Sequence, residues 1–258
     1  MYTDTHFHYL ETIQKGYSHD ELLTKMKDAH ISLAIDVSIR GHIDMDQRLK
    51  ALKDYPFVYF SAGYHPGRTN SIAAQEAAKQ LEPLLDIERV VAVGETGLDY
   101  YRDYGEADAQ KQLFAVQLEL AQQKKLPVII HNRQASKDVI AMLQSIPLNA
   151  SGIIHCFDAD LESAHRFLDL GMYISFSGNI TFKRNEELRK ILTEIPDDRL
   201  LLETDSPYLT PEPKRGKTNH PGRIIHSYKM AAQCRNTTVE KLAKQVQENT
   251  KKLCPRIQ

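Results

Sequence analysis

The chain has 258 residues, which is enough for one large domain with a substantial core. With 41% hydrophobic and 26% charged residues it has the composition of a globular protein, and no apolar run reaches the roughly 18 residues of a membrane span. The net charge of −1 argues against a large electrostatic footprint on duplex nucleic acid. The start of the chain lacks a signal-peptide pattern and the three cysteines are far apart, so we expect a cytoplasmic protein with reduced cysteines.

Short apolar, β-branched segments recur along the chain and are predicted to be strands. Several are continuously apolar, which is typical of parallel strands that are covered on both faces. In chain order, the eight segments comprise residues 2–5, 32–37, 58–62, 90–93, 128–130, 152–154, 173–176 and 200–202.

Segments with helical periodicity separate the predicted strands. Residues 110–124 carry an apolar stripe and end in lysines, where the helix dipole favours cations. Residues 75–85 and 163–170 show a similar pattern, and Gly171 is placed to end the latter helix. This alternation predicts an α/β fold, a single (β/α)8 TIM barrel that forms one domain over residues 1–258. An open doubly wound sheet is the competitor, but no Gly-x-Gly-x-x-Gly follows the first strand.

Histidines and carboxylates stand at the carboxyl ends of five predicted strands. In a barrel these ends meet on one face, where active sites are built. His6 and His8 are one residue apart, and in an extended chain such residues project from the same side. One polar residue at such a position is commonly a turn former, but several together predict a metal site. The predicted ligands of two divalent ions are His6, His8, Glu95, His131, His155 and Asp205.

Two of these carboxylates are the predicted catalytic residues. Glu95 is placed to bridge the two ions, and Asp205 to orient or deprotonate a water that the metals activate. An N-capping or turn role is the alternative for Asp205. Four imidazoles suit zinc, manganese or iron better than magnesium, which prefers oxygen ligands.

Further polar residues near these strand ends are candidates for substrate binding. His65 is a candidate contact for a substrate oxygen or phosphate. Arg133, two residues beyond His131, either clamps an anionic group or forms a salt bridge with the next helix. Glu203 is either a partner of a ligand histidine or a carboxylate of the barrel core, and both readings stay open.

With these residues laid out, the sequence resembles the TatD family of metal-dependent deoxyribonucleases, within the amidohydrolase-like barrels. The resemblance covers essentially the whole chain, in order. It implies a (β/α)8 barrel, magnesium as cofactor, hydrolysis of phosphodiester bonds in DNA, the same six metal ligands, and His65 as a phosphate contact. The matching segments are DTHFH at 4–8, GYHP at 63–66, GETGLDYYRD at 94–103, PVIIHNRQA at 127–135, IIHCF at 153–157, YISFSGNITFK at 173–183 and LLLETDSPYLTPEPKRGKTNHP at 200–221.

The chain departs from the family pattern at three places. The acid that follows the first motif is displaced to Glu11, Asp158 and Ala159 replace a Ser-Gly pair, and His220 stands where glutamate is common. None of these positions is a predicted ligand, but each would reshape the substrate rim.

The predicted function is a metal-dependent deoxyribonuclease that cleaves DNA through a metal-activated water. Strand ends or single strands are the expected substrates, because tight duplex binding needs many phosphate contacts. A lactonase, amidohydrolase or esterase acting on a small molecule at the same site is the alternative, since one barrel hosts many chemistries. A purely structural metal is disfavoured because such sites are closed and usually rich in thiolates. No obligate protein partner and no membrane association are expected.

Overall fold

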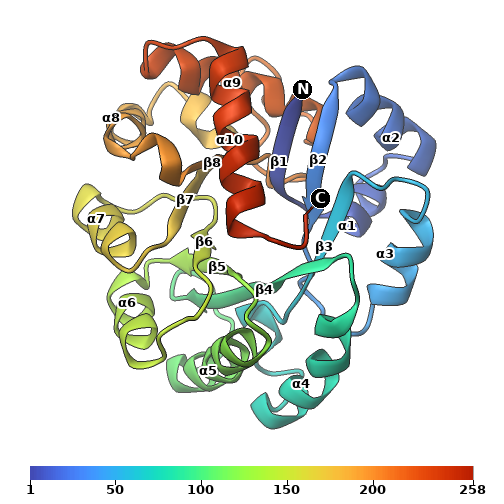
Figure 1. Ribbon diagram of the computed structural model, residues 1–258, viewed down its shortest axis with the longest axis vertical. Helices are drawn as coiled ribbons and strands as arrows, with labels where there is room; N and C mark the ends of the chain where they lie inside the picture. Colours follow the sequence, from blue (N-terminus) through green and yellow to red (C-terminus); the bar gives the residue numbers. More distant parts are fainter. Residues whose placement is uncertain (258) are drawn as a thin grey trace.

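Strand pairing in the computed structural model, which describes residues 1–257, follows the chain order from the first strand to the eighth. Every neighbouring pair is parallel, and the sheet curls into a barrel with helices around it (Figure 1). The (β/α)8 barrel prediction is therefore confirmed. The strands are β1 (Tyr2–Phe7), β2 (Ile31–Asp36), β3 (Val58–Ala62), β4 (Val90–Asp99), β5 (Val128–Arg133), β6 (Gly152–Ile154), β7 (Tyr173–Phe176) and β8 (Leu200–Leu202).

The barrel closes where the residues after β8 meet the end of β1. Phe7 and Ser206 form a parallel bridge. The His8 N–H donates to the Ser206 carbonyl over 2.8 Å, and the Asp205 N–H donates to the His6 carbonyl over 2.9 Å. Closure therefore brings Asp205 beside the two histidines of the first strand, although about 200 residues separate them in the sequence.

The helices lie outside the barrel and follow the strands in alternation (Figure 1). The predicted helix at 110–124 is part of a longer one, whereas the one at 75–85 continues beyond residue 81 as a 3-10 segment, Glu82–Asp86. Pro83 explains this change, because it has no N–H to continue an α-helical ladder. The α-helices are α1 (Tyr9–Gln14), α2 (His19–Asp28), α3 (Met45–Ala51), α4 (Ala74–Leu81), α5 (Ala107–Lys124), α6 (Ser136–Ser145), α7 (Leu161–Asp169), α8 (Glu186–Glu194), α9 (Ile224–Cys234) and α10 (Val239–Leu253).

Strand β4 is longer than the predicted segment 90–93 and carries Glu95 inside it rather than after it. Gly97 makes this extension possible. Its φ is +138°, and a Cβ there would lie 2.0 Å from the His131 carbonyl oxygen, so no other residue fits. The extra length brings Asp99 into the mouth of the barrel beside β5.

Helix α10 covers the amino-terminal end of the barrel, where Figure 1 shows it in front of the strands. Asn249 donates from its side chain to the carbonyl of Leu200 at the start of β8, and Gln247 donates to the Ser32 hydroxyl near the start of β2. The opposite, carboxyl-terminal end is thus the end that stays available for a site. None of the helices within residues 1–257 has the length and apolarity that a membrane crossing would need.

Candidate metal centre

The structure brings the predicted metal ligands together at the carboxyl-terminal end of the barrel. His8 lies just beyond β1, but its backbone is still extended, with φ −116° and ψ 102°. His6 and His8 therefore project from the same side, and their Nε2 atoms are 3.2 Å apart. In a helix the two side chains would point in nearly opposite directions, so the extended backbone that the sequence predicts is what brings them together.

The Glu95 carboxylate lies at the middle of the group. Its Oε2 atom is 3.5 Å from His6 Nε2 and 3.7 Å from His8 Nε2. Its Oε1 atom is 2.8 Å from His131 Nδ1 and also 2.8 Å from His155 Nε2. Each carboxylate oxygen thus faces a different pair of imidazole nitrogens.

The outer ring nitrogens of two histidines are hydrogen-bonded, and this fixes which nitrogen is left for an ion. His8 Nδ1 donates to the Val37 carbonyl over 2.9 Å. His131 Nε2 donates to Asp99 Oδ2 over 3.0 Å. The inner nitrogens, which face Glu95, are therefore the ones that would coordinate a metal ion on giving up their protons, as in metal-ligating histidines.

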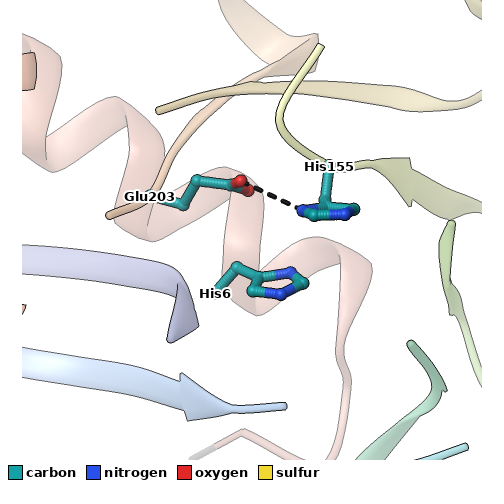
Figure 2. A group of neighbouring side chains, drawn as sticks. All are labelled: His6, His155 and Glu203. Atoms are coloured by element: carbon teal, nitrogen blue, oxygen red, sulfur yellow. Dashed lines mark hydrogen bonds and ion pairs between the residues drawn. The ribbon is translucent and has the colours of Figure 1, made fainter. Parts of the chain in front are cut away.

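The Glu203 carboxylate binds the outer ring nitrogen of His155 in the same way. His155 Nδ1 is 3.2 Å from Glu203 Oε1, while Ser175 Oγ donates to Glu203 Oε2 over 2.5 Å. Figure 2 shows the carboxylate reaching this nitrogen, with the His6 ring stacked beneath the His155 ring at 4.0 Å between centroids. Of the two readings that the sequence leaves open for Glu203, the structure supports the histidine partner.

Asp205 is the carboxylate of the centre with most access to the cavity, since 13% of its side chain is exposed. Its Oδ1 atom is 3.5 Å from His8 Nε2. Burial opposes ionisation of this group, but the hydrogen bond with His8 and the positive charges of His6 and His155 lower its pKa. Asp205 is therefore ionised at neutral pH and able to accept a proton.

The charges of the group favour a cation at its centre. Burial of Glu95 opposes its ionisation, yet the charge on His155 and the hydrogen bonds with His131 and His155 hold the pKa of Glu95 well below its usual range. Burial likewise opposes protonation of His8, but the hydrogen bond with Asp205 and the Glu95 charge raise the pKa of His8 to about 9. Ionised carboxylates that attract positive charge, together with converging imidazole nitrogens, fit divalent metal ions.

His65 lies at the edge of the same group but presents a donor instead of a lone pair. Its Nδ1 accepts the Gly67 N–H over 2.9 Å, so the proton of the neutral ring is on Nε2, which is 3.7 Å from Glu95 Oε1. Burial lowers the pKa of His65 to about 3, so the ring is neutral. This tautomer suits a contact with a substrate oxygen better than metal ligation.

Arg133 lines the cavity above the centre, which has a volume of about 580 Å³. Its guanidinium carbon is 4.1 Å from the centroid of the Tyr101 ring. Within the described part of the chain no salt bridge joins it to the next helix, where Asp138 pairs with Lys111 instead, so that alternative is not observed. Arg133 interacts electrostatically with Asp158, whose carboxylate lines the same cavity.

Asp99 is a residue of the centre to which the sequence analysis assigns no role. Asp99 lies four residues after Glu95, so in an extended strand both side chains point to the same face. This spacing could have indicated Asp99 as a member of the centre. It was missed because the predicted strand ends at residue 93, before either carboxylate.

An eight-stranded parallel barrel with a buried histidine–carboxylate centre at its carboxyl-terminal end defines the class of metal-dependent hydrolase barrels. The family described as "TatD related DNase" matches residues 3–255, and the chain belongs to this family. It is a metal-dependent hydrolase.

Relatives in both sequence and structure agree with this membership. The chain is 35% identical over 254 residues to the "Uncharacterized metal-dependent hydrolase YabD" of Bacillus subtilis (strain 168), covering 98% of each chain. It is 32% identical over 251 residues to the "3'-5' ssDNA/RNA exonuclease TatD" of Pantoea sp. (strain At-9b), covering 95% of this chain and 96% of that one. The crystal structure of YjjV, a TatD homologue from Escherichia coli K12, superposes with a TM-score of 0.90 at 29% identity, covering 98% of both chains.

Proposed function

We propose that this chain is a nuclease that hydrolyses phosphodiester bonds in DNA, at single strands or strand ends, with two divalent metal ions. The observation that carries the proposal is the position of Glu95, whose two oxygens face separate pairs of imidazole nitrogens. The printed activity of the Pantoea relative supports nucleic acid as the substrate. The net charge of −1 favours short contacts with strand ends over extended duplex binding.

In this proposal Glu95 would be the shared ligand, His6 and His8 would hold one ion, and His131 and His155 would hold the other. A pair of divalent ions, when bound, lowers the pKa of water and neutralises charge on the attacking and leaving oxygens. Asp205, beside the first histidine pair, orients the attacking water and accepts its proton.

Two further groups of the chain are proposed to bind the phosphates of the substrate. His65 donates from Nε2 to a phosphate oxygen, because its Nδ1 is already used as an acceptor. Arg133 binds an adjacent phosphate, since its guanidinium lines the cavity and interacts with the nearby Asp158 carboxylate without a close ion pair among the described residues. Four imidazole ligands favour manganese or zinc, whereas the family resemblance implies magnesium.

Single-stranded oligonucleotides labelled at the 3' or the 5' end test this function. Cleavage is expected with magnesium or manganese and is expected to disappear with EDTA and in His131→Ala. The position of the label in the shortest products reports the polarity. Absence of metal-dependent cleavage by the wild-type protein would overturn the nuclease proposal. Turnover of a panel of lactones and esters under the same conditions would then favour a small-molecule hydrolase.

The double variant His6→Ala, His8→Ala is expected to lose one of two bound ions and keep the barrel fold. Both imidazoles face the Oε2 atom of Glu95. Removing them therefore leaves one of the two proposed ion positions without nitrogen ligands. Elemental analysis of the purified protein measures the stoichiometry, and circular dichroism checks the fold. His165→Ala, which removes an exposed imidazole on α7, serves as control. Unchanged stoichiometry in the double variant would contradict the assignment of this pair.

Asp99→Asn is expected to weaken metal affinity about 10-fold to 100-fold, the usual effect of losing a group that orients a ligand histidine. Asparagine keeps an Oδ1 acceptor for the N–H groups of Tyr101 and Arg102, so the turn after β4 is preserved. Its amide would instead present a donor to His131 Nε2. Competition with a chromogenic chelator measures the affinity. Asp138→Asn is the matched control, because Asp138 pairs with Lys111 near the protein surface. Equal affinities in both variants would show that Asp99 does not orient His131.

A further inference from the structure

Two exposed tyrosines flank the mouth of the cavity. Large apolar side chains are exposed at few of the described positions, and they include Tyr101, which is 59% exposed, and Tyr208, which is 47% exposed. Tyr208 lines the cavity directly, and Tyr101 packs on Arg133, which also lines it. Neither ring belongs to the hydrophobic core, and both lie beside the cavity.

The Tyr208 backbone is held firmly against the metal centre. Its N–H donates to the Asp205 carbonyl over 2.8 Å, and its own carbonyl accepts from Asn219 Nδ2 over 2.6 Å. Asn219 is fully buried and also donates to the Thr204 carbonyl over 3.0 Å. The ring stands edge-to-face against the His8 imidazole, with centroids 6.1 Å apart. An exposed aromatic ring on a firmly held backbone thus lines the cavity beside a predicted metal ligand.

A cation lies on the other side of the mouth. Arg133 ends β5, whereas Tyr208 follows β8, and β6 and β7 lie between these two strands in the barrel. The Tyr101 ring under the guanidinium limits where Arg133 can point. An aromatic ring and a cation that line one cavity from different strands match a base and a phosphate of the same short strand.

We propose that Tyr208 stacks on an unpaired nucleobase next to the phosphodiester that is hydrolysed. This inference rests on the proposed function and names the structural feature of the substrate that it recognises. Aromatic side chains bind bases of any sequence in this way, because every base has a π face. A base inside a duplex is already stacked, so the platform accepts an end that is frayed or single-stranded.

Oligonucleotides that end in a normal nucleotide or in an abasic one test the stacking. The wild-type protein and Tyr208→Phe, which keeps the ring, are expected to favour the normal end by at least about fivefold in kcat/KM. Tyr208→Leu, which removes the ring, is expected to bring this ratio close to one. Abasic residues are placed at the 3' end and at the 5' end in separate substrates, so that either polarity is covered. A ratio that is the same in the wild type and Tyr208→Leu would overturn the proposal.

A binding measurement separates this inference from the nuclease proposal. Calorimetry compares deoxyadenosine 5'-monophosphate with deoxyribose 5-phosphate on the three proteins, without any cleavage. At least about fivefold tighter binding of the nucleotide is expected in the wild type and Tyr208→Phe, but not in Tyr208→Leu. Equal binding of both ligands by the wild type would overturn the stacking proposal, even if the protein cleaves DNA. Absence of cleavage with this binding pattern intact would instead overturn only the nuclease proposal.

Discussion

Asp205→Asn is expected to lower kcat by about 10²-fold to 10⁴-fold, the range that a positioned general base contributes. The carboxylate is ionised in the folded protein, because its pKa lies below the usual value, and it has access to the cavity. Asparagine has nearly the same shape but cannot accept a proton. The backbone of Asp205 has a φ of +52°, which asparagine tolerates better than most residues, so the turn should stay intact.

Steady-state kinetics on a labelled oligonucleotide at saturating metal measure this effect. Asp158→Asn neutralises another carboxylate that lines the same cavity, and we expect it to change kcat far less. Thermal unfolding of both variants shows whether the fold is retained. If Asp205→Asn keeps wild-type kcat while bound metal is unchanged, another group accepts the proton.

The metal centre could largely be predicted from the sequence because its geometry follows from local periodicity. Two histidines one residue apart on a strand must share a face, and the close approach of their Nε2 atoms follows from this. Parallel strands place their carboxyl ends together, so Glu95, His131 and His155 also converge once the barrel is assumed. No long-range information beyond the strand order is needed for this part.

The partners that orient these ligands could not be predicted in the same way. Asp99 reaches His131 only because β4 continues through Gly97, and a glycine beyond the predicted end of a strand gives no sign that the strand continues. Glu203 follows β8 and reaches His155, which follows β6, past the intervening strand β7. These contacts depend on how far a strand extends and on side-chain packing across the barrel, which periodicity does not describe.

A buried ion pair next to β1 and β2 likewise could not be predicted from the sequence. Arg48 in α3 is 2% exposed, and its Nε donates to Asp36 Oδ2 over 2.7 Å. Arg48 also donates to the Asp36 carbonyl over 2.5 Å and to the Ser61 carbonyl over 3.2 Å. Asp36 Oδ1 accepts the Tyr9 N–H over 2.8 Å, directly after His8. The pair therefore links α3, β2 and the end of β1, and it supports one wall of the metal centre.

Arg48→Met is expected to destabilise the fold by about 3–5 kcal/mol, because it leaves the buried Asp36 carboxylate without its cation. For a chain of this length the midpoint of thermal unfolding should fall by about 6–20 °C, measured by circular dichroism. The double variant Asp36→Asn, Arg48→Met should recover most of this loss. It removes both charges, and the asparagine Oδ1 still accepts the Tyr9 N–H. If the double variant is as unstable as Arg48→Met, the loss comes from the missing arginine contacts and not from an unpaired charge. Because the pair lies behind His8, we also expect Arg48→Met to lose metal more readily on heating than the double variant does.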